Sequence, residues 1–189
     1  GLVGFAGFGF LSGFDPSLAM VGTLVSDTAL SYGLSVIPMF ILMGNFVARA
    51  GLSSDLYDAS HAFLGHRRGG LSMATIVACG GFSAICGSSL ATAATMSKVA
   101  MPPMRKYGYA DTLATASIAA GGTLGILIPP SVILVIYGLM TETSIRELFA
   151  AGFLPGLLGI LLYMAAVKYV VWRDPAAGVP DPRLLARSL

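Results

Sequence analysis

Charged residues are missing from five long stretches of this 189-residue chain. All 11 basic and 9 acidic residues lie outside these stretches. Because a charged side chain is costly in the hydrocarbon of a bilayer, this segregation divides the chain into a part that avoids water and a part that meets it. The uncharged stretches are residues 1–14, 28–48, 69–97, 112–141 and 148–167.

The composition excludes several classes of protein. Charged residues make up 11% of the chain and hydrophobic residues 56%, whereas a typical soluble domain is about 25% charged. A soluble globular domain, a disordered tail and a nucleic-acid-binding protein are therefore excluded, the last because it needs far more Lys and Arg. The remaining class is an all-α membrane protein, a polytopic bundle of helices.

The chain begins directly in apolar sequence. Gly1 follows no basic segment, so we do not interpret the start as a signal peptide. Residues 1–12 would span only about 18 Å as a helix, against a hydrocarbon core of about 30 Å. We therefore expect a truncated first helix and a chain that is a fragment of a longer protein.

The distribution of Lys and Arg predicts how one uncharged stretch lies in the membrane. If every stretch crossed once, the basic residues would divide seven to four between the two sides. If residues 69–97 instead enter and leave by the same side, segments 49–68, 98–111 and 168–189 share ten basic residues and the opposite side holds only Arg146. The second arrangement fits the positive-inside rule far better.

Local sequence supports a re-entrant hairpin at this place. Residues 70–86 predict a helix of about 25 Å and residues 90–101 one of about 18 Å, and Pro102 and Pro103 are expected to end the second. The tip between them, residues 86–89, is small and polar (Cys-Gly-Ser-Ser). Irregular backbone at membrane depth needs protein or a water-filled cavity around it, so the tip is expected near a site.

A discontinuous helix is expected next. Residues 109–141 are longer than one span requires and contain glycines and prolines in the middle. Glycine permits unwound backbone, proline removes a donor, and the residue before a proline is pushed away from helical geometry. We predict half-helices over about 110–122 and 131–141. The residues expected to break the helix are Gly121, Gly122, Gly125, Pro129 and Pro130.

The remaining segments complete the expected organisation. The spacing of Leu52, Leu56, Ala59 and Phe63 predicts an amphipathic helix along the membrane surface. The expected divisions are scaffold transmembrane helices at 1–50, this arm helix at 51–68, the re-entrant hairpin at 69–104, the discontinuous helix at 109–141, a transmembrane helix at 145–173 and a linker at 174–189.

Hairpin tips and broken helices form midplane sites in secondary transporters, where carbonyls bind cations and half-helix N-termini attract anions. Sodium prefers oxygen ligands, which Ser hydroxyls and backbone carbonyls supply. The Ser131 N–H and hydroxyl open a half-helix, a place suited to a carboxylate. The predicted sodium ligands are Gly87, Ser88, Ser89 and Thr92 with Gly122, Thr123, Gly125 and Ile126. The predicted substrate-binding residues are Ser88, Ser89, Pro129, Pro130 and Ser131.

Two other classes of membrane protein could also contain such residues. Gly, Ser and Thr also allow close helix packing, which would suit a non-transporting membrane assembly module. An intramembrane serine hydrolase needs a base, but His61 and His66 lie outside the uncharged stretches and no G-x-S-x-G elbow is present. We therefore expect no enzyme activity and no transition-metal site.

Six sequence runs together resemble the large membrane subunit of TRAP (tripartite ATP-independent periplasmic) transporters, the DctM-like family. The resemblance covers nearly all of residues 1–173. The runs are PMFILMGN at 38–45, RGGL at 68–71, GSSLATAA at 87–94, GGTLGILIPPS at 121–131, IYG at 136–138 and LFAAGFLPG at 148–156.

The resemblance implies a member of the ion transporter superfamily, with two inverted repeats and an elevator mechanism in the bacterial inner membrane. It implies uptake of organic acids such as dicarboxylates or sialic acid, driven by sodium as coupling ion, with no other cofactor. The implied partners are a small membrane subunit, a periplasmic substrate-binding protein and membrane lipids. The family's sodium site would fall on Gly87, Ser88 and Ser89 with Gly122, Thr123 and Gly125. The chain would hold only the first repeat and the linker after it.

Overall fold

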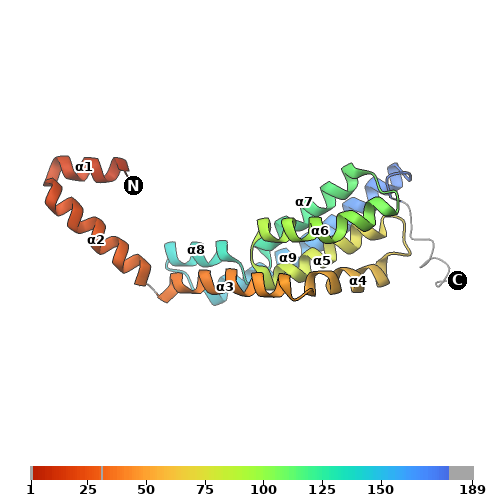
Figure 1. The fold of residues 1–189 in the computed structure, drawn as a ribbon, viewed down its shortest axis with the longest axis horizontal. Helices are drawn as coiled ribbons and strands as arrows, with labels where there is room; N and C mark the ends of the chain where they lie inside the picture. Colours follow the sequence, from red (N-terminus) through yellow and green to blue (C-terminus); the bar gives the residue numbers. More distant parts are fainter. Residues whose placement is uncertain (1, 31, 179–189) are drawn as a thin grey trace. The chain divides into compact units, whose positions relative to one another are not determined.

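The computed structural model describes the backbone of residues 2–30 and 32–178 and the side chains of residues 2–27 and 37–178. The regular elements in these residues are all α-helices, as predicted (Figure 1). Most of the predicted linker 174–189 lies outside the described residues. The helices are α1 (Leu2–Ser12), α2 (Phe14–Leu30), α3 (Tyr32–Arg49), α4 (Leu52–Leu64), α5 (Gly70–Cys86), α6 (Ser89–Lys106), α7 (Asp111–Leu127), α8 (Val132–Met140) and α9 (Ile145–Arg173).

The chain divides into two compact units, Gly1–Met39 and Phe40–Leu189. In the first unit, α1 and α2 meet at a corner where Gly13 has a φ of 95°, a conformation that favours glycine. The Ser17 hydroxyl donates a hydrogen bond of 2.8 Å to the Gly13 carbonyl. The charged segment 15–27 is helical and belongs to α2.

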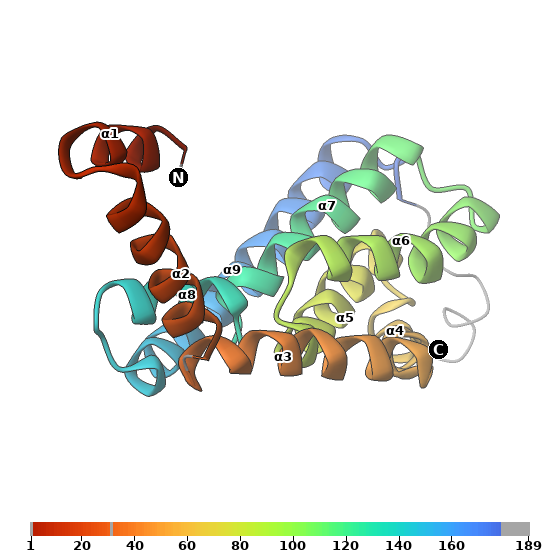
Figure 2. The ribbon, with the colours of Figure 1, turned by 60° about the vertical axis from the view of Figure 1, so that its left-hand side comes forward.

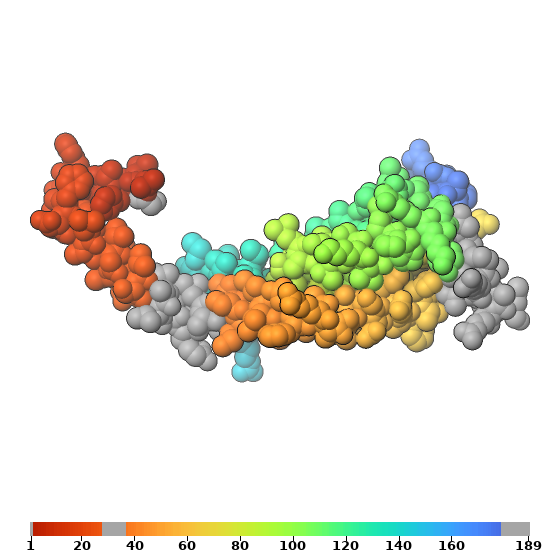
Figure 3. All heavy atoms as spheres, in the orientation of Figure 1, coloured from red at the N-terminus to blue at the C-terminus, as the bar shows by residue number. Residues whose placement is uncertain are grey.

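The second unit is built around α5, α6 and α7, which all contact one another. Helices α5 and α6 form an antiparallel hairpin, and α7 packs against both arms. Helix α4 lies beside α6 on one face (Figure 3), and α9 lies beside α7 on another (Figure 2). Fully buried apolar side chains fill the centre, among them Leu71, Ile76, Phe82, Met96, Met104 and Leu124.

Three chain segments that carry basic residues meet at one end of this unit. The Gly69 N–H donates to the Gly178 carbonyl at 3.2 Å, and the Ala110 N–H donates to the Ala177 carbonyl at 3.2 Å. These bonds join the α4–α5 and α6–α7 connections to the segment after α9. The distribution of Lys and Arg predicts that these segments share one side of the membrane, and in the structure they lie together. We call the region formed by the α4–α5 connection, the α6–α7 connection and the segment after α9 the basic end.

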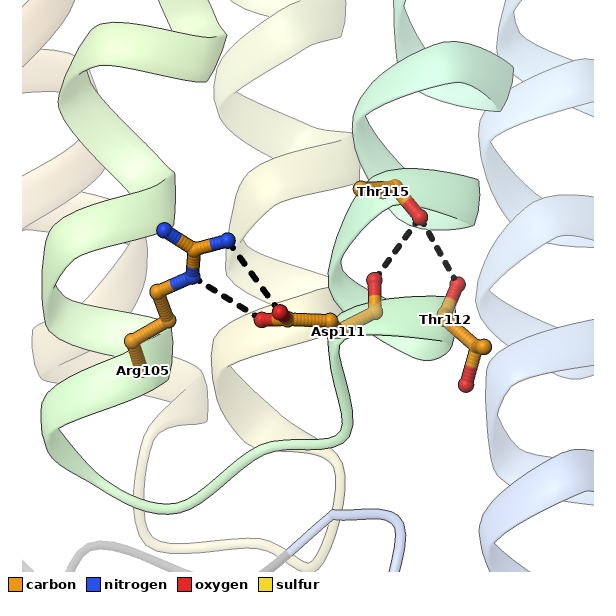
Figure 4. A network of polar contacts seen from close by, with 4 residues as sticks. All are labelled: Arg105, Asp111, Thr112 and Thr115. Carbon is orange, nitrogen blue, oxygen red and sulfur yellow. Dashed lines mark hydrogen bonds and ion pairs between the residues drawn. The ribbon is translucent and has the colours of Figure 1, made fainter.

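The α6–α7 connection is held by an exposed ion pair at the basic end (Figure 4). The Arg105 guanidinium donates to both carboxylate oxygens of Asp111, at 2.9 and 3.1 Å. Asp111 is also the acidic residue in the first turn of α7, where the helix dipole favours a negative charge. The Thr115 hydroxyl donates to the carbonyls of Asp111 and Thr112 in the same turn.

Two expectations about helix ends are wrong. Pro102 and Pro103 do not end the second hairpin arm, because α6 continues through both to Lys106. A proline lacks a donor, but its carbonyl still accepts, and the Tyr107 N–H bonds to the Pro103 carbonyl at 3.0 Å. Gly121, Gly122 and Gly125 do not unwind α7, which continues to Leu127, so the break is only Ile128–Ser131 long.

The described residues contain two candidate membrane spans by length and composition. One is Asp111–Met140, which includes the break between α7 and α8, and the other is Ile145–Arg173. A third would be the pair Ile37–Arg49 and Leu52–Leu64, bent by 62°, if it counts as one broken or re-entrant span. In α4, Leu56 packs against Gly81 of α5, whereas Phe63 is 78% exposed.

Candidate functional site

The hairpin tip turns within two residues. Gly87 ends α5 in the left-handed conformation, with a φ of 64°, and its N–H donates to the Ser83 carbonyl at 3.1 Å. Ser88 is the extended N-cap of α6 and its hydroxyl accepts from the Ala91 N–H at 3.4 Å. Glycine at the C-terminal end and serine at the N-cap are the residues these positions favour, so the tip is locally encoded.

The break between α7 and α8, like the hairpin tip, ends in a serine N-cap. Ile128 is extended, and Ser131 is the N-cap of α8. The Ser131 hydroxyl is buried, donates to the Ile126 carbonyl at 2.8 Å and accepts from the Leu134 N–H at 3.4 Å. The hydrogen-bonding capacity of this hydroxyl is thus largely used within the chain, and its predicted role in substrate binding stays a prediction.

The structure brings the hairpin tip and the break into direct contact. The Val132 N–H, in the first turn of α8, donates to the Gly87 carbonyl at 3.3 Å. The Pro130 carbonyl lies so close to the Gly87 Cα that a Cβ at this position would collide with it. Two segments more than 40 residues apart in sequence therefore form one region, as the sequence predicted for its candidate site.

The glycines of α7 make this contact possible by close packing. A Cβ on Gly125 would lie 2.8 Å from the carbonyl carbon and oxygen of Ser88 and from the nitrogen of Ser89. A Cβ on Gly122 would lie 2.8 Å from the Cβ of Ala93. These glycines allow α7 to approach α6 closely, as glycines do at packed helix interfaces. The backbone that they approach is that of the predicted sodium site.

The other predicted sodium ligands lie in different surroundings. The Thr92 hydroxyl is fully buried, and the polar group beside it is the Cys86 thiol. The Thr123 side chain points to α9, where its hydroxyl lies 2.9 Å from the Tyr163 hydroxyl. Ile126 contributes a carbonyl that already accepts from Ser131.

Helix α9 shows how far the tip lies from the basic end. A Cβ on Gly156 would lie 2.7 Å from Cγ1 of Ile128 in the break, while Val167 and Val171 contact Gly69 at the basic end. About 26 Å of helix separates Gly156 from Arg173, whereas the whole of α9 is about 43 Å long. The break, and the tip that contacts it, therefore lie partway along α9, which is a candidate membrane span.

Residues outside the predicted set also shape this region. Gly44 of α3 approaches Cys86, where a Cβ would lie 3.1 Å from the thiol sulfur. Gly152 of α9 approaches the Leu127 carbonyl, where a Cβ would lie 2.9 Å from the oxygen. The sequence gives no indication that Gly44 lies near the site. Gly152 and Gly156 match the G-x-x-x-G motif, which indicates helix packing but not a site.

The fold and this region define a helical membrane protein in which the tip of a helical hairpin meets a discontinuous helix. Residues 2–185 match the family described as "Tripartite ATP-independent periplasmic transporter, DctM component". The chain belongs to this family, which confirms the resemblance found in the sequence. The family is one of transporter permeases and not of enzymes.

Three relatives illustrate the match. A C4-dicarboxylate TRAP transporter large permease protein of Pseudomonas aeruginosa is 41% identical over 161 residues, 85% of this chain and 38% of the relative. An ectoine/5-hydroxyectoine TRAP transporter large permease protein of Ruegeria pomeroyi is 38% identical over 177 residues, which are 92% of this chain and 41% of the relative. A sialic acid TRAP transporter permease protein of Haemophilus influenzae is 36% identical over 139 residues, which are 74% of this chain and 22% of the relative. The chain thus spans about two fifths or less of these relatives.

Proposed function

We propose that this chain is part of the large permease subunit of a sodium-coupled TRAP transporter that imports an organic acid. The observation that carries the proposal is the contact between the hairpin tip and the α7–α8 break. It supports a midplane site because the irregular backbone of the tip lies against that of the break, partway along the long helix α9. We place the protein in the bacterial inner membrane, with the hairpin α5–α6 re-entrant from the basic end.

The sodium ion would bind between the tip and α7. Ser88 and Ser89 supply hydroxyl and carbonyl oxygens there, and the buried Thr92 hydroxyl supplies another. Gly122 and Gly125 contribute by letting the backbones approach. The Thr123 hydroxyl faces Tyr163, so only its carbonyl is proposed as a ligand.

The substrate would bind on the α8 side of the same region. The N-terminus of α8 carries a partial positive charge that favours a carboxylate. Because the Ser131 hydroxyl caps α8, we assign it to holding the half-helix in place, with Pro129 and Pro130 shaping the extended segment before it. The relatives' names include C4-dicarboxylate and sialic acid, which fit an organic acid as the substrate class.

Movement in an elevator mechanism requires the tip and the broken helix to travel as one body. The close packing of α7 against α5 and α6 at Gly121, Gly122 and Gly125 supports this. The small membrane subunit and the periplasmic binding protein are proposed as partners from family membership.

The proposal is tested by the sodium dependence of uptake in proteoliposomes that contain the whole transporter. In the double variant S88A/S89A we expect the half-saturating sodium concentration to rise about tenfold, the effect of losing about 1.4 kcal/mol of ion binding. Ser97→Ala is the matched control, since this exposed α6 hydroxyl bonds only to the Ala94 carbonyl in the described structure. Unchanged sodium dependence in the double variant would contradict the assignment of Ser88 and Ser89 to the sodium site.

A further inference from the structure

A pocket at the basic end is not explained by the transport site. It lies between the α4–α5 connection and the last turns of α9, about 26 Å of helix away from the break. Its volume is about 310 Å³. The residues that line it are Arg67, Arg68, Met73, Lys168, Val171, Trp172 and Pro175.

Three cations converge on this pocket from two elements. Arg67 and Arg68 come from the α4–α5 connection and Lys168 from α9, and all three are exposed. Within the described residues no ion pair involves any of them, and no acidic residue lines the pocket. The nearby Asp174 carboxylate accepts a hydrogen bond from the Ala176 N–H at 3.1 Å. The pocket therefore has a concentrated positive charge that the described chain does not neutralise.

The rest of the lining is apolar and aromatic. Met73 is in the first turn of α5, so the positive end of that helix dipole adds to the charge. Trp172 is 78% exposed, and its ring lies 6.2 Å from that of Tyr169. Exposed Trp and Tyr at the end of a membrane-spanning helix are typical of the membrane–water interface. The pocket thus lies at the depth where lipid headgroups meet the hydrocarbon.

The outer face of α9, which leads away from the pocket, is apolar. Its side chains facing outward are large and apolar, and include Leu154, Leu157, Leu158, Leu161 and Leu162, all exposed. A ligand with a negative headgroup and long acyl chains would match both parts, whereas a free inorganic anion would use only the cations.

We propose that this pocket binds the phosphate of an anionic membrane phospholipid, such as phosphatidylglycerol. The Arg67 and Arg68 guanidinium groups would donate to the phosphate oxygens, Lys168 would add a point charge, and the acyl chains would follow the outer face of α9. Basic pockets between helices near the membrane surface are suited to this class of ligand.

The test is native mass spectrometry of the whole transporter in detergent, titrated with phosphatidylglycerol or with phosphatidylcholine of the same chains. The variant R68Q/K168Q removes two pocket cations, and K98Q/K106Q removes two exposed cations that do not line it. We expect the affinity for phosphatidylglycerol to fall about twenty-fivefold in the first variant, roughly fivefold for each cation. It should change less than twofold in the second, and the charge-conserving R68K/K168R should retain most of the binding.

Other results would overturn the proposal. Equal loss in both double variants would show a general charge effect, and equal binding of phosphatidylcholine would show that no anionic group is recognised. Displacement of the lipid by millimolar inorganic phosphate would show a site for free phosphate. A photo-crosslinking residue in place of Trp172 should capture lipid; capture of another subunit instead would show a protein interface.

Discussion

At the scale of single residues, Gly125 connects packing to the proposed site. Its Cα faces the peptide bond between Ser88 and Ser89, and backbone atoms cannot rotate away as a side chain does. The same α7 face carries Gly121, where an added Cβ would lie 2.7 Å from the Cys79 sulfur. Small residues here are required by geometry, whatever ion or solute the region binds.

We predict that Gly125→Ala lowers the free energy of unfolding by about 1–3 kcal/mol, as overpacking of a tight core does. The measurement is denaturant unfolding of the purified transporter in detergent. Gly22→Ala in α2 is the control, because no atom lies within 4 Å of its added Cβ, and alanine favours helix. Equal stability of the Gly125 variant and wild type would contradict the packing described here.

A second prediction concerns Gly87, which combines a φ of 64° with the adjacent Pro130 carbonyl. Gly87→Ala meets both obstacles and should reduce sodium-driven uptake strongly while the protein still inserts in the membrane. Gly108→Ala is the comparison, because Gly108 has a φ of 76° but open space around it. If both variants lost uptake equally, backbone strain alone would explain the effect, and the tip–break contact would carry no role.

At the scale of elements, α5 begins without a side-chain cap from its own N-cap residue, Gly69. The Tyr109 hydroxyl, from the α6–α7 connection, accepts a hydrogen bond of 3.1 Å from the Leu71 N–H. Both groups are buried. A residue 38 positions away thus completes the first turn of the hairpin and ties it to the start of α7.

Removing this bond has a predictable cost. Tyr109→Phe should lower the free energy of unfolding by about 1–3 kcal/mol, because a buried N–H loses its acceptor. The same denaturant titration measures it, with Tyr169→Phe, an exposed tyrosine on α9, as the control. A stability equal to wild type would mean that another acceptor replaces the hydroxyl.

At the scale of the whole molecule, the meeting of three basic segments carries a topological prediction. Cysteines replacing Arg67 and Lys106 should react with a membrane-impermeant maleimide from the same side, and one replacing Arg146 from the opposite side. Cys79 and Cys86 are buried and should not react in intact membranes. Labelling of the first two positions from opposite sides would refute the re-entrant hairpin.

Sequence reasoning predicted the helical hairpin because its signals do not depend on how the helices pack. The small, polar run at residues 86–89, the ten-to-one distribution of basic residues and the lengths of the uncharged stretches can each be read without knowledge of neighbouring helices. It placed the break of α7 too early. Glycine permits unwinding but does not enforce it, and in the described structure the glycines serve contacts with α5 and α6.

The sequence by itself determined that this protein is a membrane protein of helices, with a polar hairpin tip and an interrupted helix, because charge segregation and proline placement follow from solvent and backbone chemistry. Only the tertiary structure decided that the break is confined to Ile128–Ser131, that the Thr123 hydroxyl faces α9, and that Arg67, Arg68 and Lys168 line one pocket. These features depend on which helix faces lie together, and long-range packing sets that choice.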